Sequence, residues 1–378
     1  MTTDARRIDL AGLDALIILL EQAGWRVLGP TVRDGAIDFA PVHGVADLAR
    51  GVGDDQAPGR YRLREREDDA LFAYAAGAQS VKPVLFPADQ VLWRSRQGTD
   101  GPQLSAPDPA QDAPRFALLG VRPCDLRAIA LHDTILLRRA AVDVHYAARR
   151  DQCLLIAVTC TDPAGTCFCT SMGGDPKPDS GYDLALTELY DDGSHRFVVE
   201  AASPRGADLL EQVGAEIATA DDVAAAARVA ARARERIHRT LPADEVHDLL
   251  YANTDSPRWE EVATRCLACT NCTLVCPTCF CTTITDTTDL HGEAARHRVW
   301  DSCFSREYSY IHGGSVRESV RSRYRQWITH KLASWQDQFG TSGCVGCGRC
   351  IAWCPAGIDL TAEVAALHET SPTSHAHR

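Results

Sequence analysis

Cys266-Leu-Ala-Cys269-Thr-Asn-Cys272-Thr-Leu-Val-Cys276-Pro277 is the stretch that decides the fold of this 378-residue chain. The same spacing returns in Cys344-Val-Gly-Cys347-Gly-Arg-Cys350-Ile-Ala-Trp-Cys354-Pro355. Both are C-x2-C-x2-C-x3-C-P runs, a pattern that binds 4Fe–4S clusters. Three thiolates spaced in this way let one tight loop surround three corners of a cubane cluster. The fourth cysteine, which precedes the proline, points away and binds the neighbouring cluster.

The spacing therefore predicts a ferredoxin-type domain with two 4Fe–4S clusters and crossed ligation. The expected ligands of one cluster are Cys266, Cys269, Cys272 and Cys354, and those of the other are Cys344, Cys347, Cys350 and Cys276. Crossed ligation would fasten the two motifs together, whatever the length of the segment between them. The competing interpretation is a pair of structural zinc sites. Zinc, however, usually takes its four ligands as two separated pairs.

Composition also favours metal binding in a reducing compartment. Sixteen cysteines occur in a chain whose N-terminal apolar run, residues 16–20, is too short for a secretory or membrane segment. We therefore predict a cytoplasmic protein, in which disulfides are disfavoured and clustered cysteines bind metal. The formal charge of −12 argues against nucleic-acid binding, which needs a basic surface.

The predicted fold class is α+β, with a mixed α/β N-terminal domain before the helical cluster domain. Apolar runs at 116–121, 154–159 and 197–200 predict strands, and the first two are unbroken enough for interior strands covered on both faces. Helices are expected over 10–24, 125–137 and 221–240, and the linking segment 289–339 should be mostly helical. Stretches rich in glycine and proline predict loops at 95–113 and 172–181.

These elements suggest three parts of the chain. Residues 1–240 would form the α/β domain, with room for an extra metal site or a subunit-docking site. Residues 241–368 would form the dicluster 4Fe–4S domain, and residues 369–378, which carry no pattern, a disordered tail.

The other eight of the sixteen cysteines leave two interpretations open. Cys124, Cys160, Cys167 and Cys169 would be a full ligand set for a third 4Fe–4S cluster. Alternatively they are reduced thiols lining an interface, which is also the simplest interpretation of Cys153. A third set, Cys279, Cys281 and Cys303, has only three thiolates and makes a weaker ligand set.

The sequence offers no catalytic residue and no binding motif for an organic cofactor. It has no G-x-G-x-x-G after a strand, no Walker loop, no G-x-S-x-G elbow and no H-E-x-x-H. A chain with clusters but no reaction centre is expected to be an electron conduit, with the chemistry in partner subunits. A stand-alone enzyme with a cryptic flavin site and a regulatory iron–sulfur protein are the alternatives.

Phrases outside the two cluster motifs carry a family resemblance. They are Leu119-Gly-Val-Arg-Pro-Cys-Asp-Leu-Arg-Ala-Ile129, Cys167-Phe-Cys-Thr-Ser-Met-Gly-Gly174, Gly181-Tyr-Asp-Leu184, Cys276-Pro-Thr-Cys-Phe-Cys281, Arg298-Val-Trp-Asp-Ser-Cys303 and Arg323-Tyr-Arg-Gln326. With these the sequence resembles the β-subunit of cytoplasmic NAD(P)-linked nickel–iron hydrogenases, also called sulfhydrogenases. It is also similar to the sister family, the A subunit of anaerobic sulfite reductase.

The resemblance implies a hetero-oligomeric complex. In it, the β-subunit relays electrons between the hydrogenase large and small subunits, which hold nickel–iron and further clusters, and a flavin subunit that reduces NAD(P). The family's cluster ligands fall on the eight motif cysteines without a gap. The sulfite reductase partner remains the alternative, because the two families share these motifs.

Overall fold

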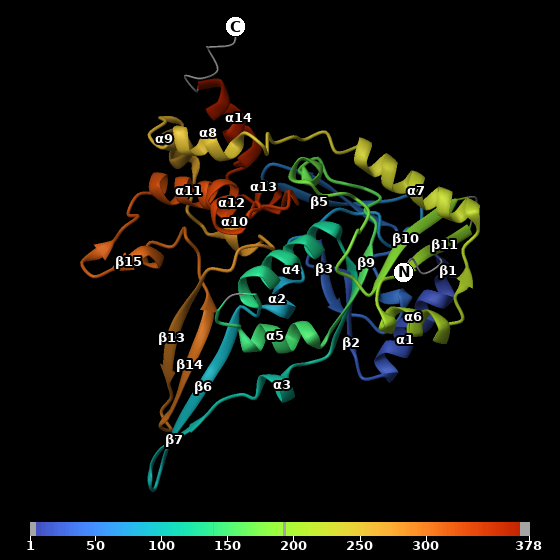
Figure 1. Ribbon diagram of the computed structural model, residues 1–378, viewed down its shortest axis with the longest axis horizontal. Helices are drawn as coiled ribbons and strands as arrows, with labels where there is room; N and C mark the ends of the chain where they lie inside the picture. Colours follow the sequence, from blue (N-terminus) through green and yellow to red (C-terminus); the bar gives the residue numbers. More distant parts are fainter. Residues whose placement is uncertain (1–4, 139, 192–193, 371–378) are drawn as a thin grey trace.

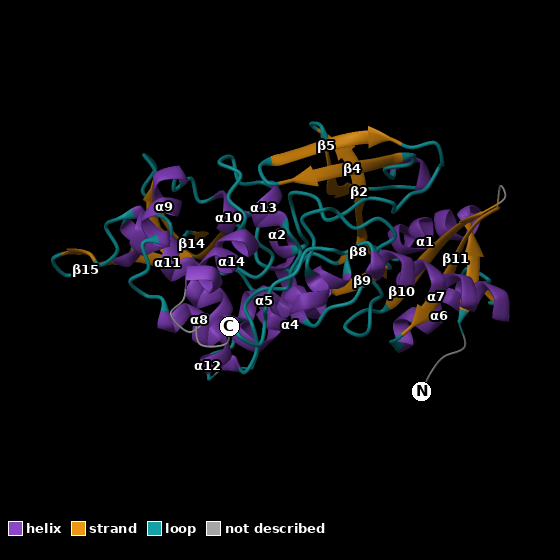
Figure 2. Ribbon diagram, turned by 90° about the horizontal axis from the view of Figure 1, so that it is seen from above, coloured by secondary structure: helices purple, strands orange, loops and turns teal. Residues whose placement is uncertain are grey.

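The computed structural model describes residues 5–138, 140–191 and 194–370. Figures 1 and 2 show a large sheet with its helices at one end of the molecule and the short C-terminal helices gathered at the other. This arrangement confirms the predicted fold class, a mixed α/β N-terminal region followed by a helical C-terminal region. A narrow second sheet projects away from both parts (Figure 1).

The main sheet has eight strands in the order β12-β1-β11-β10-β9-β8-β2-β3. Its centre, β2-β8-β9-β10, is parallel, and antiparallel strands flank it on both sides. β8 covers the predicted 116–121, β9 is shifted by one residue from the predicted 154–159, and β11 extends the predicted 197–200 by three residues at one end and one at the other. The strand bounds are β1 Arg6–Asp9, β2 Arg26–Arg33, β3 Ala36–Pro41, β8 Phe116–Val121, β9 Cys153–Val158, β10 Leu184–Asp191, β11 Ser194–Ala201 and β12 Glu216–Ile217.

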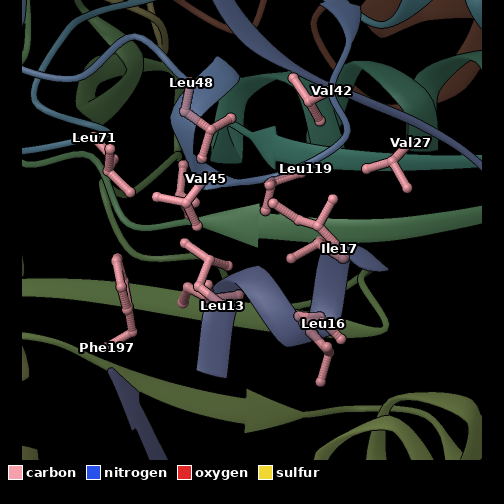
Figure 3. Close-up of a cluster of buried hydrophobic side chains, with 14 of the residues drawn as sticks. Leu13, Leu16, Ile17, Val27, Val42, Val45, Leu48, Leu71, Leu119 and Phe197 are labelled. Atoms are coloured by element: carbon pink, nitrogen blue, oxygen red, sulfur yellow. The ribbon is translucent and has the colours of Figure 1, made fainter. Parts of the chain in front are cut away.

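Helices cover both faces of this sheet, as the unbroken apolar strands predicted. On one face, α1 inserts Leu13, Leu16 and Ile17 against the sheet residues Leu119 and Phe197 (Figure 3). On the other face, the helices α2, α4 and α5 pack over neighbouring side chains of β8 and β9. The helix bounds of this region are α1 Leu10–Gln22, α2 Lys82–Leu85, α3 Pro109–Asp112, α4 Pro123–Leu136, α5 Val144–Asp151, α6 Pro204–Gln212 and α7 Ala220–Glu235.

The predicted loop at 95–113 is wrong, because residues 95–98 and 101–105 are strands of the projecting sheet. That sheet has the order β13-β14-β6-β7, with β13 Thr282–Thr288, β14 Glu293–Trp300, β6 Asp89–Gly98 and β7 Gly101–Ser105. β6 pairs with β14, which lies almost two hundred residues further along the chain. The sheet therefore spans the boundary expected near residue 240, and the domain limits stay a prediction. Two small hairpins complete the strands, β4 Val52–Ala57 with β5 Arg60–Glu65 and β15 Tyr310–Ile311 with β16 Gly314–Ser315.

The linking segment is α-helical only from residue 320, so the prediction for 289–319 is wrong. Residues 293–300 are a strand held by its partner β6, a single 3-10 turn covers Glu307–Ser309, and a turn at His312 and Gly313 separates β15 from β16. The C-terminal helices are α8 Val246–Ala252, α9 Arg258–Arg265, α10 Asn271–Leu274, α11 Val320–Thr329, a π turn His330–Ser334, α12 Trp335–Phe339, α13 Arg349–Ala352 and α14 Leu360–Thr370. Of the tail expected at 369–378, the first two residues end α14, and 371–378 lie outside the described residues.

Candidate metal centre

The first motif forms a pocket together with two cysteines of the second motif, Cys350 and Cys354. Cys266, Cys269, Cys272 and Cys354 line it, so the structure brings together the four side chains expected to share a cluster. Local backbone geometry shapes the loop: Ala268 and Thr270 adopt left-handed conformations with φ of 49° and 68°. Backbone N–H groups face the sulfurs, since Ala268 N donates to Cys266 Sγ at 3.4 Å and Ile358 N donates to Cys354 Sγ at 3.3 Å. We call these four cysteines the first group.

Apolar and aromatic side chains close the pocket of the first group, among them Phe304, Tyr324 and Trp327. The hydroxyl of Tyr324 and the indole Nε1 of Trp327 are buried and have no hydrogen-bond partner among the described residues. Buried donors normally have acceptors, so these two fit a site whose acceptor is a bound group. Burial, and then the neighbouring cysteines, raise the pKa of the Cys272 thiol well above its usual value. A raised pKa means that ionising this buried thiol costs free energy. Iron binds cysteines as thiolates, so iron binding would offset that cost of ionisation.

The second group consists of three cysteines of the second motif, Cys344, Cys347 and Cys350, and Cys276 of the first motif. Besides burial, which is the largest cause, Cys344, Cys347 and Cys276 raise the pKa of Cys350, so the four thiols lie within electrostatic range of one another. Gly346 N donates to Cys344 Sγ at 3.4 Å. Cys276 of the first motif is therefore within electrostatic range of Cys350, as it is of Cys272 in its own motif.

Lys331 is a residue of this site that sequence analysis missed. It lies in the π turn, is only 6% exposed, and its Nζ donates to Cys276 Sγ at 3.2 Å and to Thr278 Oγ1 at 3.0 Å. Burial alone would lower the pKa of Lys331, but the thiols of Cys276 and Cys279 outweigh it and raise that pKa well above its usual value. The ammonium therefore stays charged beside the sulfurs. A lysine in a helical stretch gives no sequence signal for such a role.

The second motif is docked against the N-terminal region. Arg349 is 1% exposed and forms two parallel hydrogen bonds to the Asp125 carboxylate, at 2.8 and 2.9 Å. A Cβ added at Gly346 would lie 2.6 Å from Cys169 Cα, and one at Gly348 would lie 2.4 Å from Thr166 O. Phe168 N also donates to Gly346 O at 2.9 Å. Glycine is therefore required where the two loops meet.

The other cysteines fall into three places. Cys124, Cys160, Cys167 and Cys169 lie beside the second motif, each half-buried. Cys153 lies apart from them in the core under α4 and α5, where burial raises its pKa to about 12.

Cys281 and Cys303 are neighbours near Lys331. A hydrogen bond from Cys303 is the main reason that the pKa of Cys281 falls to about 6. Cys279 lies beside Cys276, within 3.6 Å of the Lys331 ammonium. Within residues 5–138, 140–191 and 194–370, no group of three or more His, Cys, Asp or Glu is arranged to hold a single metal ion.

Comparison with known proteins identifies two similarities. The sequence model of the 4Fe–4S dicluster domain family matches residues 265–358, a range that contains all eight cysteines of the two groups. The chain is also similar to sulfhydrogenase 2 subunit beta of Pyrococcus furiosus, with 32% identity over 248 residues, which is 65% of this chain and 72% of that subunit. None of the helices in the described part of the chain is both long and apolar enough to cross a membrane.

Proposed function

Because the chain belongs to the sulfhydrogenase β-subunit family and carries a 4Fe–4S dicluster domain, we propose that it relays single electrons between a nickel–iron hydrogenase module and a flavin/NAD(P) module. The coarser statement, an iron–sulfur electron-transfer subunit, rests on the family itself. The observation that supports the proposal is that Cys354 lines the pocket of the first motif, while Cys276 lies within electrostatic range of Cys350 in the second.

The proposed ligands are Cys266, Cys269, Cys272 and Cys354 for one 4Fe–4S cluster, and Cys344, Cys347, Cys350 and Cys276 for the other. Bound clusters supply one-electron chemistry at potentials that their surroundings set. The chain's own residues do the tuning. N–H donors at the sulfurs and the Lys331 ammonium favour the more negative, reduced state, and the aromatic walls of the first pocket keep water away.

The proposed partners are the hydrogenase large and small subunits and a flavin/NAD(P) reductase subunit, in a cytoplasmic hetero-oligomer. The relative's name, a sulfhydrogenase subunit, supports this choice over the sulfite reductase. Purification of the native complex without oxygen, followed by metal and cofactor analysis, tests it. Nickel and flavin in the complex are expected, whereas sirohaem without nickel would identify the partner as a sulfite reductase instead of a hydrogenase.

The relay itself is tested by Cys350→Ser in that complex. Damage to one cluster should abolish hydrogen-dependent reduction of NAD(P), while hydrogen exchange at the nickel site and NAD(P)H-driven dye reduction at the flavin survive. Cys153→Ala, in the core away from both groups, is the matched control and should leave coupling intact. Loss of both half-reactions in an assembled complex would mean that this chain takes part in the chemistry. Unimpaired coupling would mean that electrons bypass it.

A further inference from the structure

Four cysteines outside the dicluster motifs meet beside the second group, although they come from distant parts of the chain. Cys124 lies in the first turn of α4, Cys160 follows β9, and Cys167 and Cys169 lie in the next loop. Cys124 and Cys169 both lie against the second motif, since Cys124 packs in the small cluster that contains Val345 and a Cβ at Gly346 would be 2.6 Å from Cys169 Cα. The electrostatic influence of Cys160 on the other three thiols agrees with this placement.

The site contains a buried arginine whose hydrogen bonds are incomplete. Arg122 is 2% exposed and its Nη2 donates to Phe72 O at 2.9 Å, but its Nε and Nη1 have no partner among the described residues. Its guanidinium lies over the Tyr74 ring at 4.1 Å and beside the Cys160 thiol. A buried cation with unpaired N–H groups is costly, so these donors are expected to meet an acceptor at this point.

A second arginine near the four cysteines, Arg127, also has an N–H group without a partner in the described part of the chain. Arg127 donates through Nη2 to Met172 O at 2.6 Å, and its buried Nη1 has no partner in the described part of the chain. It lies close enough to Cys169 to lower the pKa of that thiol against the larger effect of burial. By contrast, the third nearby arginine, Arg349, is neutralised by Asp125. Thus, among the described residues, two arginines that form no ion pair lie beside Cys160 and Cys169.

We propose that Cys124, Cys160, Cys167 and Cys169 bind a third 4Fe–4S cluster, with Arg122 and Arg127 donating to its sulfurs. An oxidised four-iron cluster on four thiolates is a dianion, which the two arginines would balance. The cluster would accept one electron and pass one on, as the other two do.

The second group is the nearest exchange partner for such a cluster. Cys124 packs against the small buried cluster that contains Cys347, and Phe168, between Cys167 and Cys169, is hydrogen-bonded to Gly346. The close approach that Gly346 and Gly348 permit therefore brings the third site against the second group. With a cluster at this place, electrons would also pass through the N-terminal region. With two clusters only, that region has no redox role.

Iron and acid-labile sulfide are to be measured on the full chain purified without oxygen, alone and in its complex. We expect about twelve of each for the wild type, and about eight for Cys160→Ser with the signals of the other two clusters retained. Cys153→Ala should keep about twelve. About eight in the wild type, unchanged by Cys160→Ser, would overturn the third cluster and leave the two-cluster relay standing. Stoichiometric zinc that Cys160→Ser removes would also overturn it, and a wild type without iron would overturn the relay as well.

Arg122→Gln keeps the proposal testable if Cys160→Ser does not fold. The variant should retain the iron, but one cluster should become harder to reduce because a buried positive charge is lost. Redox titration followed by EPR would show one midpoint potential falling and two unchanged. Three unchanged potentials, or a shift in a cluster that Cys344→Ser also perturbs, would contradict the assignment of Arg122 to a separate cluster.

Discussion

The two cysteine groups share one spacing but lie in different surroundings. The first group is enclosed by the helical C-terminal region itself, with neutral donors on Tyr324 and Trp327 and one exposed thiol, Cys269. The second group has two charged residues beside it: Arg349 fastens it to Asp125 of the N-terminal region, and Lys331 donates to Cys276 within the C-terminal region. The spacing of the motif thus determines which cysteines are expected to bind, whereas the surrounding chain determines how exposed they are and which charged residues lie near them.

The largest expected effect is on the docking of the second motif. Asp125→Ala leaves the Arg349 guanidinium buried without its carboxylate, which should lower the free energy of unfolding by about 3–5 kcal/mol. Denaturant titration of the anaerobic chain would measure it. Glu293→Ala, which breaks the exposed pair with Arg96, is the control and should cost about 0–1 kcal/mol. Equal losses in the two variants would mean that Arg349 does not fasten the two regions.

The next prediction distinguishes steric crowding between the two loops from strain in the backbone of a glycine position. Gly348→Ala places a Cβ 2.4 Å from Thr166 O at a φ of +74°, whereas Gly340→Ala has a φ of +68° and nothing within 4 Å. Both variants should lose about 1–2 kcal/mol from the left-handed conformation. Gly348→Ala should lose roughly 1–3 kcal/mol more, because the two loops are pushed apart. Similar unfolding midpoints would show that the loops are not in close contact.

The smallest expected effect is on the reduction potential of one cluster. Lys331→Met removes the charge next to Cys276 and should lower the potential of the second group's cluster by on the order of 100 mV, leaving the first unchanged. Lys331→Arg, which keeps the charge, is the matched control and should shift it far less. Redox titration monitored by EPR distinguishes the clusters. An equal shift in both would place Lys331 between the two groups instead of at one of them.

The sequence predicted the features that depend on local pattern. The unbroken apolar run at 116–121 appears as β8 with identical ends, and Cys354 lies in one pocket with Cys266, Cys269 and Cys272, as the cysteine spacing led us to expect. Features made by distant segments were missed. β6 is a strand because β14 pairs with it, and Lys331 lies near sulfur because a π turn directs it inward. Neither the polar composition of 95–113 nor a lone lysine contains that information.

The most direct test of the account is to ask which cluster each fourth cysteine serves. Cys266→Ser and Cys344→Ser first assign the EPR signals, since each removes a cysteine from within one motif's loop. Cys354→Ser should then change the same signal as Cys266→Ser, because Cys354 lies in the first group's pocket. Cys276→Ser should change the same signal as Cys344→Ser. If Cys354→Ser instead perturbs the signal of Cys344→Ser, the ligation is not crossed and the two motifs do not form one relay.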